Sequence, residues 1–383
     1  MRYSLLLLGV ALTTPALSAE WVFDGRLDPR VEYDDNVLLR DSKDSSMVYK
    51  VSPTLNLSRS LENSSVKATI GYDIERYGQL SELDTENPFA SLSGSYQSTR
   101  SAYSLTASYR EQTARSIAEE DTGDFSSNAI VRSRTIAPGY QYQLTERDSL
   151  LFSASYSERR YDASGFADND TLSISTGWSR SLTERLSGGL NLTYVQFESE
   201  STFIESDYDS YNLAVTGNYA ISERWQVNGQ VGRNYLKSRV RFVGTNIRQT
   251  ATNTGSLASI AITRLGYVDS LSLNLSRSLN PSGEGVLNEQ DRIAVNYSRD
   301  LSERLSFNLG ASYSETTSAD DLRTIDRKFT EVSPSLKWMF ARNVSVNAGY
   351  RYREQRGNTE SNVKGNAVFV SVGYDWDGFR FSR

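Results

Sequence analysis

The chain has 383 residues and a net charge of −6, and it contains neither cysteine nor histidine. The absence of cysteine excludes disulfides and thiolate chemistry, and the absence of histidine excludes Ser-His triads and His-ligated metals. Hydrophobic residues make up only 38% of this long chain. The mild acidity, without basic blocks, argues against a nucleic-acid partner. We therefore expect no enzyme, no metal and no cofactor.

Residues 1–19 have the pattern of a secretory signal peptide. Arg2 supplies the positive start, an apolar run follows at residues 5–12, and small residues at 16–19 fit a cleavage region. A membrane anchor is the alternative, but the apolar run is well short of the roughly 20 residues that a spanning helix needs. We expect one exported domain over residues 20–383.

Runs of alternating apolar and polar residues fill the chain from Trp21 onward, which predicts strands with one apolar and one polar face. In chain order, the first clear runs lie at 51–58, 66–72, 90–96 and 103–109. Short polar turns separate alternate pairs of runs, and longer acidic or glycine-containing loops separate the others. The pattern predicts a series of antiparallel hairpins.

One turn motif returns along the chain. It reads LTERDS at residues 144–149, LTERLS at 182–187, ISERWQ at 221–226 and LSERLS at 301–306. The glutamates of the first two copies are 38 residues apart, and those of the second and third are 39 apart. With the weaker turns near Asn63, Arg100, Gly266 and Arg342, eight short turns predict about eighteen strands.

A period near 40 residues also occurs in β-propellers. A propeller blade packs four short strands into that length, whereas each repeat here holds two runs of about twelve to sixteen residues. One apolar face per strand and a strict alternation of short and long connections are typical of a transmembrane β-barrel. We therefore predict an all-β, up-and-down antiparallel barrel in a bacterial outer membrane, with lipid as its outer partner.

The apolar face carries a repeated aliphatic–alanine–tyrosine pattern that ends in Tyr109, Tyr156, Tyr313 and Tyr350. Each tyrosine lies about nine residues past a turn, roughly 30 Å along a strand. Because these tyrosines share a face with the aliphatic residues, we expect an outward girdle rather than sugar-stacking rings inside the pore.

The opposite face is mostly Ser, Thr, Asn, Gln and Gly, which predicts a water-filled lumen suited to a polar solute. Charges enter this face higher up the strands, and six cations are candidate channel-lining residues: Lys50, Arg110, Arg159, Lys337, Arg351 and Arg353. Two interpretations remain open. The cations form a track for an anionic glycan, or they are neutralised by wall acids such as Glu32, Asp73 and Glu75.

Pro53, Pro138 and Pro334 each lie eight residues before a turn position. Proline removes a ladder hydrogen bond and belongs at an edge or a bulge. Their common height predicts bulges in the returning strands, with a structural role.

The sequence YDDNV at residues 33–37, followed by VSPTL at 51–55, resembles the opening of the β-barrel porins associated with exopolysaccharide export. VSP recurs at residues 332–334. The resemblance implies a barrel of about eighteen strands that passes a polymer and works beside a periplasmic polysaccharide export protein. It singles out Tyr33, Asp35 and Asn36; the alternative is that they only end a strand and begin a loop.

Two functions follow. The first is a conduit for a secreted polysaccharide, which the polar inner face and the resemblance favour. The second is a diffusion porin for small sugars or anions; a loop folded into the pore would favour it, but the predicted loops are mostly short. An outer-membrane enzyme is a third reading, which the missing histidine disfavours.

Overall fold

The computed structural model describes residues 20–382 except 203, 320–324 and 358–361. The predicted signal peptide lies outside the described residues. Within the described part, no helix has the length and apolar character needed to span a membrane. Two short 3-10 helices, η1 (Ser81–Leu83) and η2 (Ala114–Ile117), interrupt the loops.

The remaining elements are strands: β1 (Glu20–Leu27), β2 (Pro29–Asp34), β3 (Ser46–Val51), β4 (Thr54–Leu61), β5 (Ser64–Tyr77), β6 (Thr85–Gln97), β7 (Ser101–Thr113), β8 (Ile130–Gln143), β9 (Asp148–Tyr161), β10 (Asp168–Ser181), β11 (Leu186–Glu200), β12 (Ile204–Ala220), β13 (Trp225–Phe242), β14 (Arg248–Leu265), β15 (Asp269–Pro281), β16 (Leu287–Asp300), β17 (Leu305–Ser318), β18 (Asp326–Ala341), β19 (Val344–Gly357) and β20 (Val363–Ser382).

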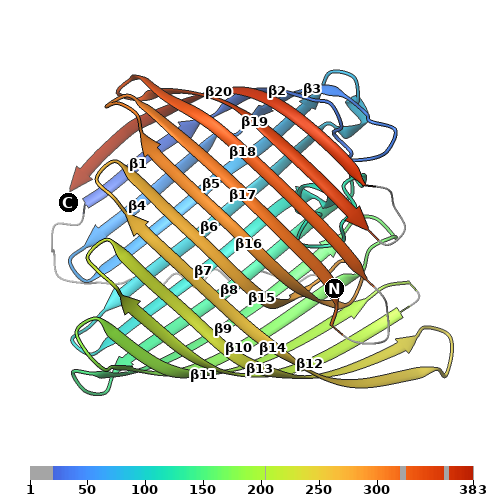
Figure 1. Ribbon diagram of the computed structural model, residues 1–383, viewed down its shortest axis with the longest axis vertical. Helices are drawn as coiled ribbons and strands as arrows, with labels where there is room; N and C mark the ends of the chain where they lie inside the picture. Colours follow the sequence, from blue (N-terminus) through green and yellow to red (C-terminus); the bar gives the residue numbers. More distant parts are fainter. Residues whose placement is uncertain (1–19, 203, 320–324, 358–361, 383) are drawn as a thin grey trace.

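These strands form one closed antiparallel barrel (Figure 1). β1 and β2 both pair with β20 and together make one wall strand, and β3 and β4, which both pair with β5, make the next. The twenty strands therefore build eighteen wall strands. Each further strand pairs with its sequence neighbours, and the β1/β2–β20 pairing closes the ring. The predicted architecture and strand number are confirmed.

All eight predicted short turns join strands at one end of the barrel, beside the C-terminus (Figure 1). The repeated motif works through its hydroxyl residue. Thr145 Oγ1 accepts hydrogen bonds from the amides of Arg147 and Asp148 at 3.2 and 3.0 Å, and Thr183 does the same one hairpin later. Ser and Thr close turns in this way. Short turns face the periplasm in bacterial outer-membrane barrels, so we take this end as periplasmic.

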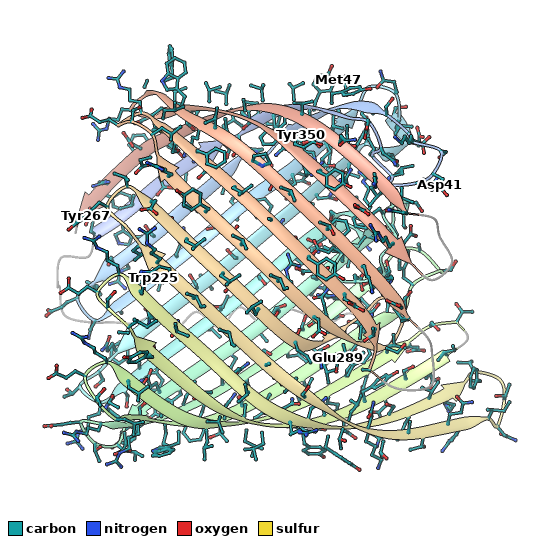
Figure 2. All side chains as sticks on the ribbon, in the orientation of Figure 1. Asp41, Met47, Trp225, Tyr267, Glu289 and Tyr350 are labelled. Carbon is teal, nitrogen blue, oxygen red and sulfur yellow. The ribbon has the colours of Figure 1, made fainter. Side chains whose placement is uncertain are left out.

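The outer face follows the predicted parity. Leu192, Leu213 and Val231 are exposed, as a lipid-facing band requires. The four predicted girdle tyrosines also lie on the outer face, and three donate hydrogen bonds to carboxylates further along the wall: Tyr109 to Glu111, Tyr156 to Asp170 and Tyr313 to Glu315. At the opposite end of the wall, Trp225 and Tyr267 lie beside the short turns (Figure 2).

The bulges predicted at the three prolines are wrong. The strand register is the same before and after Pro138 and Pro334, because the residue numbers of paired partners add to a constant on both sides. The register with β5 is also unchanged across Pro53. Pro138 and Pro334 keep their pairing with the preceding strand and interrupt only the ladder to the following one. A missing N–H therefore breaks the ladder locally without adding a residue. The register shifts lie instead between Phe23 and Gly25 and between Met339 and Ala341.

Candidate functional site: the lumen and its extracellular cap

The periplasmic half of the lumen is hollow. Side chains that face inward there, such as Ser93, Ser95, Ser104 and Gln226, are exposed even though the wall surrounds them. They belong to a wall of small hydroxyl and amide residues, whose members bond to one another across strands. Ser175 Oγ, for example, lies 2.8 Å from Thr193 Oγ1. Such a wall offers donors and acceptors to a polar solute along its whole length.

Four of the six predicted lining cations are bound to carboxylates. Lys50 Nζ lies 2.8 Å from Glu75, and an Arg110 nitrogen lies 3.0 Å from Asp73. Arg351 contacts Glu32 and Asp34, and Arg353, which is buried, donates to Asp34 at 2.7 Å. The structure thus brings these cations together with the acids named as their alternative partners.

The other two cations are separate from this cluster. Arg159 lies on β9, where it pairs in register with Ser133 and Asn169. Lys337 lies on β18 between Ser306 and Asn347, close to the periplasmic turns. Across the part of the chain that the structure describes, neither has a carboxylate within 4 Å.

The family-like motif fastens the first loop to the last strand. Asp35 accepts hydrogen bonds from the backbone N and Nδ2 of Asn366, at 2.6 and 2.8 Å. Asn36 is fully buried and donates from Nδ2 to the carbonyls of Arg40 and Lys364. Tyr33 is 48% exposed on the outer face. The contacts of Asp35 and Asn36 are those of a strand end and loop start.

The extracellular half contains the feature that the sequence reasoning missed. Residues 114–129, which join β7 to β8 and are called the crossing loop here, pass over the lumen to the opposite wall. β7 and β16 are the fifth and fourteenth of the eighteen wall strands. Arg292 on β16 nevertheless donates to Glu119 at 2.8 Å, and Gln355 on β19 donates to the carbonyl of Gly123 at 2.7 Å. The crossing loop is therefore a loop folded over the lumen, which the mostly short predicted loops did not indicate.

Asp121 is the centre of the crossing loop and is almost completely buried. Its carboxylate accepts hydrogen bonds from the Tyr161 hydroxyl at 2.6 Å and from the amide of Gly283. Its carbonyl accepts from Ser282 Oγ at 3.2 Å and from Arg327 at 3.3 Å. One residue therefore connects the crossing loop to β9, to β18 and to the loop after β15.

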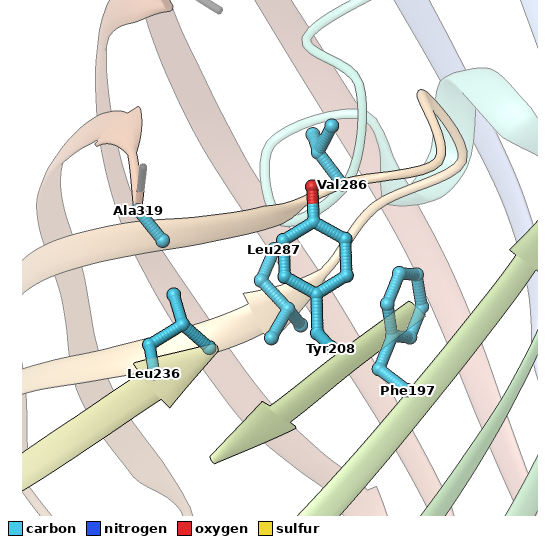
Figure 3. Close-up of a cluster of buried hydrophobic side chains, with 6 residues drawn as sticks. All are labelled: Phe197, Tyr208, Leu236, Val286, Leu287 and Ala319. Atoms are coloured by element: carbon cyan, nitrogen blue, oxygen red, sulfur yellow. The ribbon is translucent and has the colours of Figure 1, made fainter. Parts of the chain in front are cut away.

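Apolar side chains complete the closure. Phe125 of the crossing loop stacks on Phe329 of β18 with ring centroids 5.2 Å apart, beside Leu39, Ala118 and Val363. A second cluster joins the tops of β11, β12 and β13 to the loop after β15 (Figure 3). Its members are Phe197, Tyr208, Leu236, Val286, Leu287 and Ala319. We call residues 35–45, 114–129 and 282–286 the extracellular cap.

Burial in the cap raises the pKa of Glu119 above the ordinary carboxyl value, against the opposing effect of Arg292. A sequence signal for the loop does exist: it is long, and it carries Ala118 and Phe125 among polar residues. Apolar residues in a loop indicate packing, but they do not identify the strand on which they pack. Across the described ranges, no group of acidic residues is arranged to hold a metal ion.

Residues 272–375, which extend from β15 to β20, match the family model described as "Putative beta-barrel porin 2". This match and the closed barrel support a β-barrel porin family. They also support an outer-membrane location for the chain. No curated protein matches the chain.

Solved outer-membrane barrels resemble the structure. The FrpB iron transporter from Neisseria meningitidis has 8% identity and a TM-score of 0.51, with 93% of this chain and 81% of FrpB covered. The ferric citrate transporter FecA has 12% identity and the same TM-score; the match covers 87% of this chain and 60% of FecA. OpdK from Pseudomonas aeruginosa, solved with vanillate, has 10% identity and a TM-score of 0.48, with 94% and 99% covered. The FrpB and FecA likenesses show the fold alone.

Proposed function

We propose that the protein is an outer-membrane channel through which a secreted polysaccharide leaves the cell. The observation that carries this proposal is the polarity of the lumen along its axis. The periplasmic half is hollow and lined with hydroxyl and amide groups, whereas the extracellular end is covered by the cap. A solute coming from the periplasm enters an open, hydrogen-bonding vestibule and meets the closure last.

Passage of a polymer requires the crossing loop to move. The loop is held by hydrogen bonds from Tyr161, Ser282, Arg327 and Gln355, together with the Glu119–Arg292 ion pair and the Phe125–Phe329 stack. A neutral bond of this kind contributes about 0.5–1.5 kcal/mol net and a bond that involves a charged group about 1.5–3 kcal/mol, because water or a sugar hydroxyl replaces the lost partner. A glycan that reaches the loop therefore supplies the groups that substitute for its closing contacts. The proposal includes a periplasmic polysaccharide export protein at the turn rim, as the family resemblance implies.

A disulfide that holds the crossing loop shut tests this function. The natural chain has no cysteine, so Asp121→Cys combined with Ser282→Cys introduces only one possible pair. In a strain that lacks the native gene, the oxidised double variant should abolish polysaccharide secretion, and a reductant should restore it. Each single variant serves as the control. Normal secretion by the deletion strain itself would overturn the proposal.

A diffusion porin for small sugars or anions is the second candidate, and the crossing loop is the observation that favours it. A loop that crosses a lumen narrows it, and narrowing sets the size limit of a porin. Single-channel recordings on the wild-type protein separate the two functions. A steady small conductance with the cap in place supports the diffusion porin, whereas a closed channel that conducts only after the Asp121→Ala change supports export.

A further inference from the structure

We infer that the exported polysaccharide is an essentially uncharged glycan rather than a polyanion; this inference rests on the proposed function and specifies its cargo. The lumen wall divides into a charged sector, from β18 through β20 and β1 to β7, and a mostly neutral sector, from β8 to β17, in which Arg159 and Arg292 are the inward cations among the described residues. Each sector supports an uncharged glycan for a different physical reason.

In the charged sector, most cations already have an acid as a partner. Lys50 is paired with Glu75, Arg110 with Asp73, and both Arg351 and Arg353 with Asp34. Nearer the periplasmic end, Arg26 donates to Asp28 at 2.9 Å and to Asp375 at 2.7 Å. The charge of a guanidinium or ammonium group that is paired with a wall carboxylate is already balanced, so the group attracts a passing carboxylate weakly.

The unpaired charges nearly cancel. Lys67 and Lys337 in the charged sector, and Arg159 in β9, have no carboxylate within 4 Å among the residues with described positions. Against them stand two inward carboxylates, Asp24 and Glu331, that form no ion pair within 4 Å among the described residues. Asp24 instead accepts a hydrogen bond from Asn56 at 2.7 Å. A polyanion that moves past this wall therefore meets two such carboxylates for three such cations, a net excess of one positive charge.

The inward side chains of the mostly neutral sector are mainly hydroxyl and amide groups, with small and aliphatic residues such as Leu151 between them. Inward positions in register across β10 and β11 read Ser, Asn and Thr, and those across β12 and β13 read Asn and Gln. Gln226 Nε2, for example, donates to Asn218 at 3.1 Å and keeps donors and acceptors free toward the lumen. These groups exchange hydrogen bonds with sugar hydroxyls without needing a charge on the sugar.

The inward aromatic rings do not provide a separate sliding surface. Phe89 lies flat over Gly71, and Phe369 lies flat over Gly349; a β-carbon on either glycine would lie within 2.5 Å of the ring. The Arg110 guanidinium is 4.6 Å from the Phe89 centroid, and that of Arg30 is 3.7 Å from the Phe369 centroid. Because cations cover both ring faces, the lumen offers sugars hydrogen bonds rather than aromatic stacking.

The physical consequence is a lumen without a strong field of either sign. Channels that pass anionic chains concentrate them with a net positive wall. In this wall, opposite charges lie side by side in the charged sector, and amides and hydroxyls line most of the opposite sector. A glycan of neutral sugars crosses such a lumen by replacing its hydration with wall contacts, and no counter-charge is needed.

Two measurements test the inference. The first compares the polymers secreted by the wild-type and deletion strains and analyses the missing polymer for uronic acid, phosphate and sulfate. A polymer free of these groups supports the inference, and a charged repeating unit overturns it. Unchanged secretion overturns the proposed function instead, so the two failures are distinguishable.

The second measurement needs no knowledge of the polymer. The Asp121→Ala protein is reconstituted in a planar bilayer under a KCl gradient, and the reversal potential gives the potassium-to-chloride permeability ratio. We expect a ratio within about threefold of one, whereas a selectivity of about tenfold or more for either ion overturns the inference. Adding Asp73→Asn, which leaves Arg110 unpaired, should shift the ratio toward chloride and shows that the assay detects one wall charge. If the Asp121→Ala change gives no current, the same comparison is made with the crossing loop replaced by a short glycine-serine linker.

Discussion

The periplasmic and extracellular halves of the lumen share the same eighteen wall strands but differ in what their inward side chains contact. Inward serines near the turns, such as Ser95 and Ser104, remain exposed, whereas inward residues near the loops, such as Ser238 and Asn288, are almost completely buried. The outer wall is continuous through both halves. The difference teaches that the wall alone defines the lumen, whereas contacts between distant loops cover it at the extracellular end.

The largest predicted difference between the two halves comes from a substitution of Asp121. Changing Asp121 to Ala leaves the Tyr161 hydroxyl and the Gly283 amide without their acceptor, and each buried orphan costs about 1–3 kcal/mol. We expect the closed cap to lose several kcal/mol while the barrel remains folded. Channel opening in bilayers measures the change. The matched control is Asp73→Ala in the half-exposed wall, and an equal effect of both changes would contradict the division into two halves.

The next largest effect comes from a leucine-to-alanine substitution made at one position in each half. Leu236 faces inward in the extracellular half, in the cluster that includes Val286 of the cap, and is 1% exposed; Leu151 faces inward in the hollow half and is 50% exposed. Leu236→Ala should cost about 2–5 kcal/mol, because it leaves a cavity in a packed cluster. Leu151→Ala should change the free energy of unfolding by less than about 0.5 kcal/mol. Urea unfolding in detergent measures both values, and similar losses would show that the lower lumen is packed as well.

The smallest predicted effect is a pH dependence that originates in the cap. The pKa of Glu119 is raised by burial, so the closed loop binds this proton more tightly than a displaced loop does. Closure is therefore favoured below the ordinary carboxyl value of 4.5 and loses that contribution as the pH rises through the raised pKa. Open probability should rise with pH over this range and should lose the dependence in Glu119→Gln. A dependence of the opposite sign would contradict this assignment.

The sequence predicted the wall well because local rules control it. The turn hydroxyls of Thr145 and Thr183 act within two or three residues, and the two-residue alternation places Leu192 and Val231 outside without any knowledge of the partner strands. The parity remained valid through Pro138 and Pro334 because neither proline shifts the register. The alternation thus assigned the cations to the inner face but could not show which carboxylate each one meets.

The cap could not be predicted because its contacts join distant segments. Asp121 meets Gly283, and Glu119 meets Arg292, across intervals of more than 160 residues. No periodicity in the sequence records such pairs. Their contribution depends on the diameter of the ring and on the direction in which the loop leaves β7, which are properties of the assembled barrel. The resemblance at Asp35 and Asn36 marked a real structural feature, although it did not reveal its role.

The ring has a join, where β20 meets β1 and β2, and the first loop is fastened across that join by Asp35 and Asn36. Their partners Lys364 and Asn366 are on the last strand, so these particular bonds form only when the circle is complete. Assembly therefore has a built-in order. The bonds between the first loop and β20 form last, after the final strand has joined the wall.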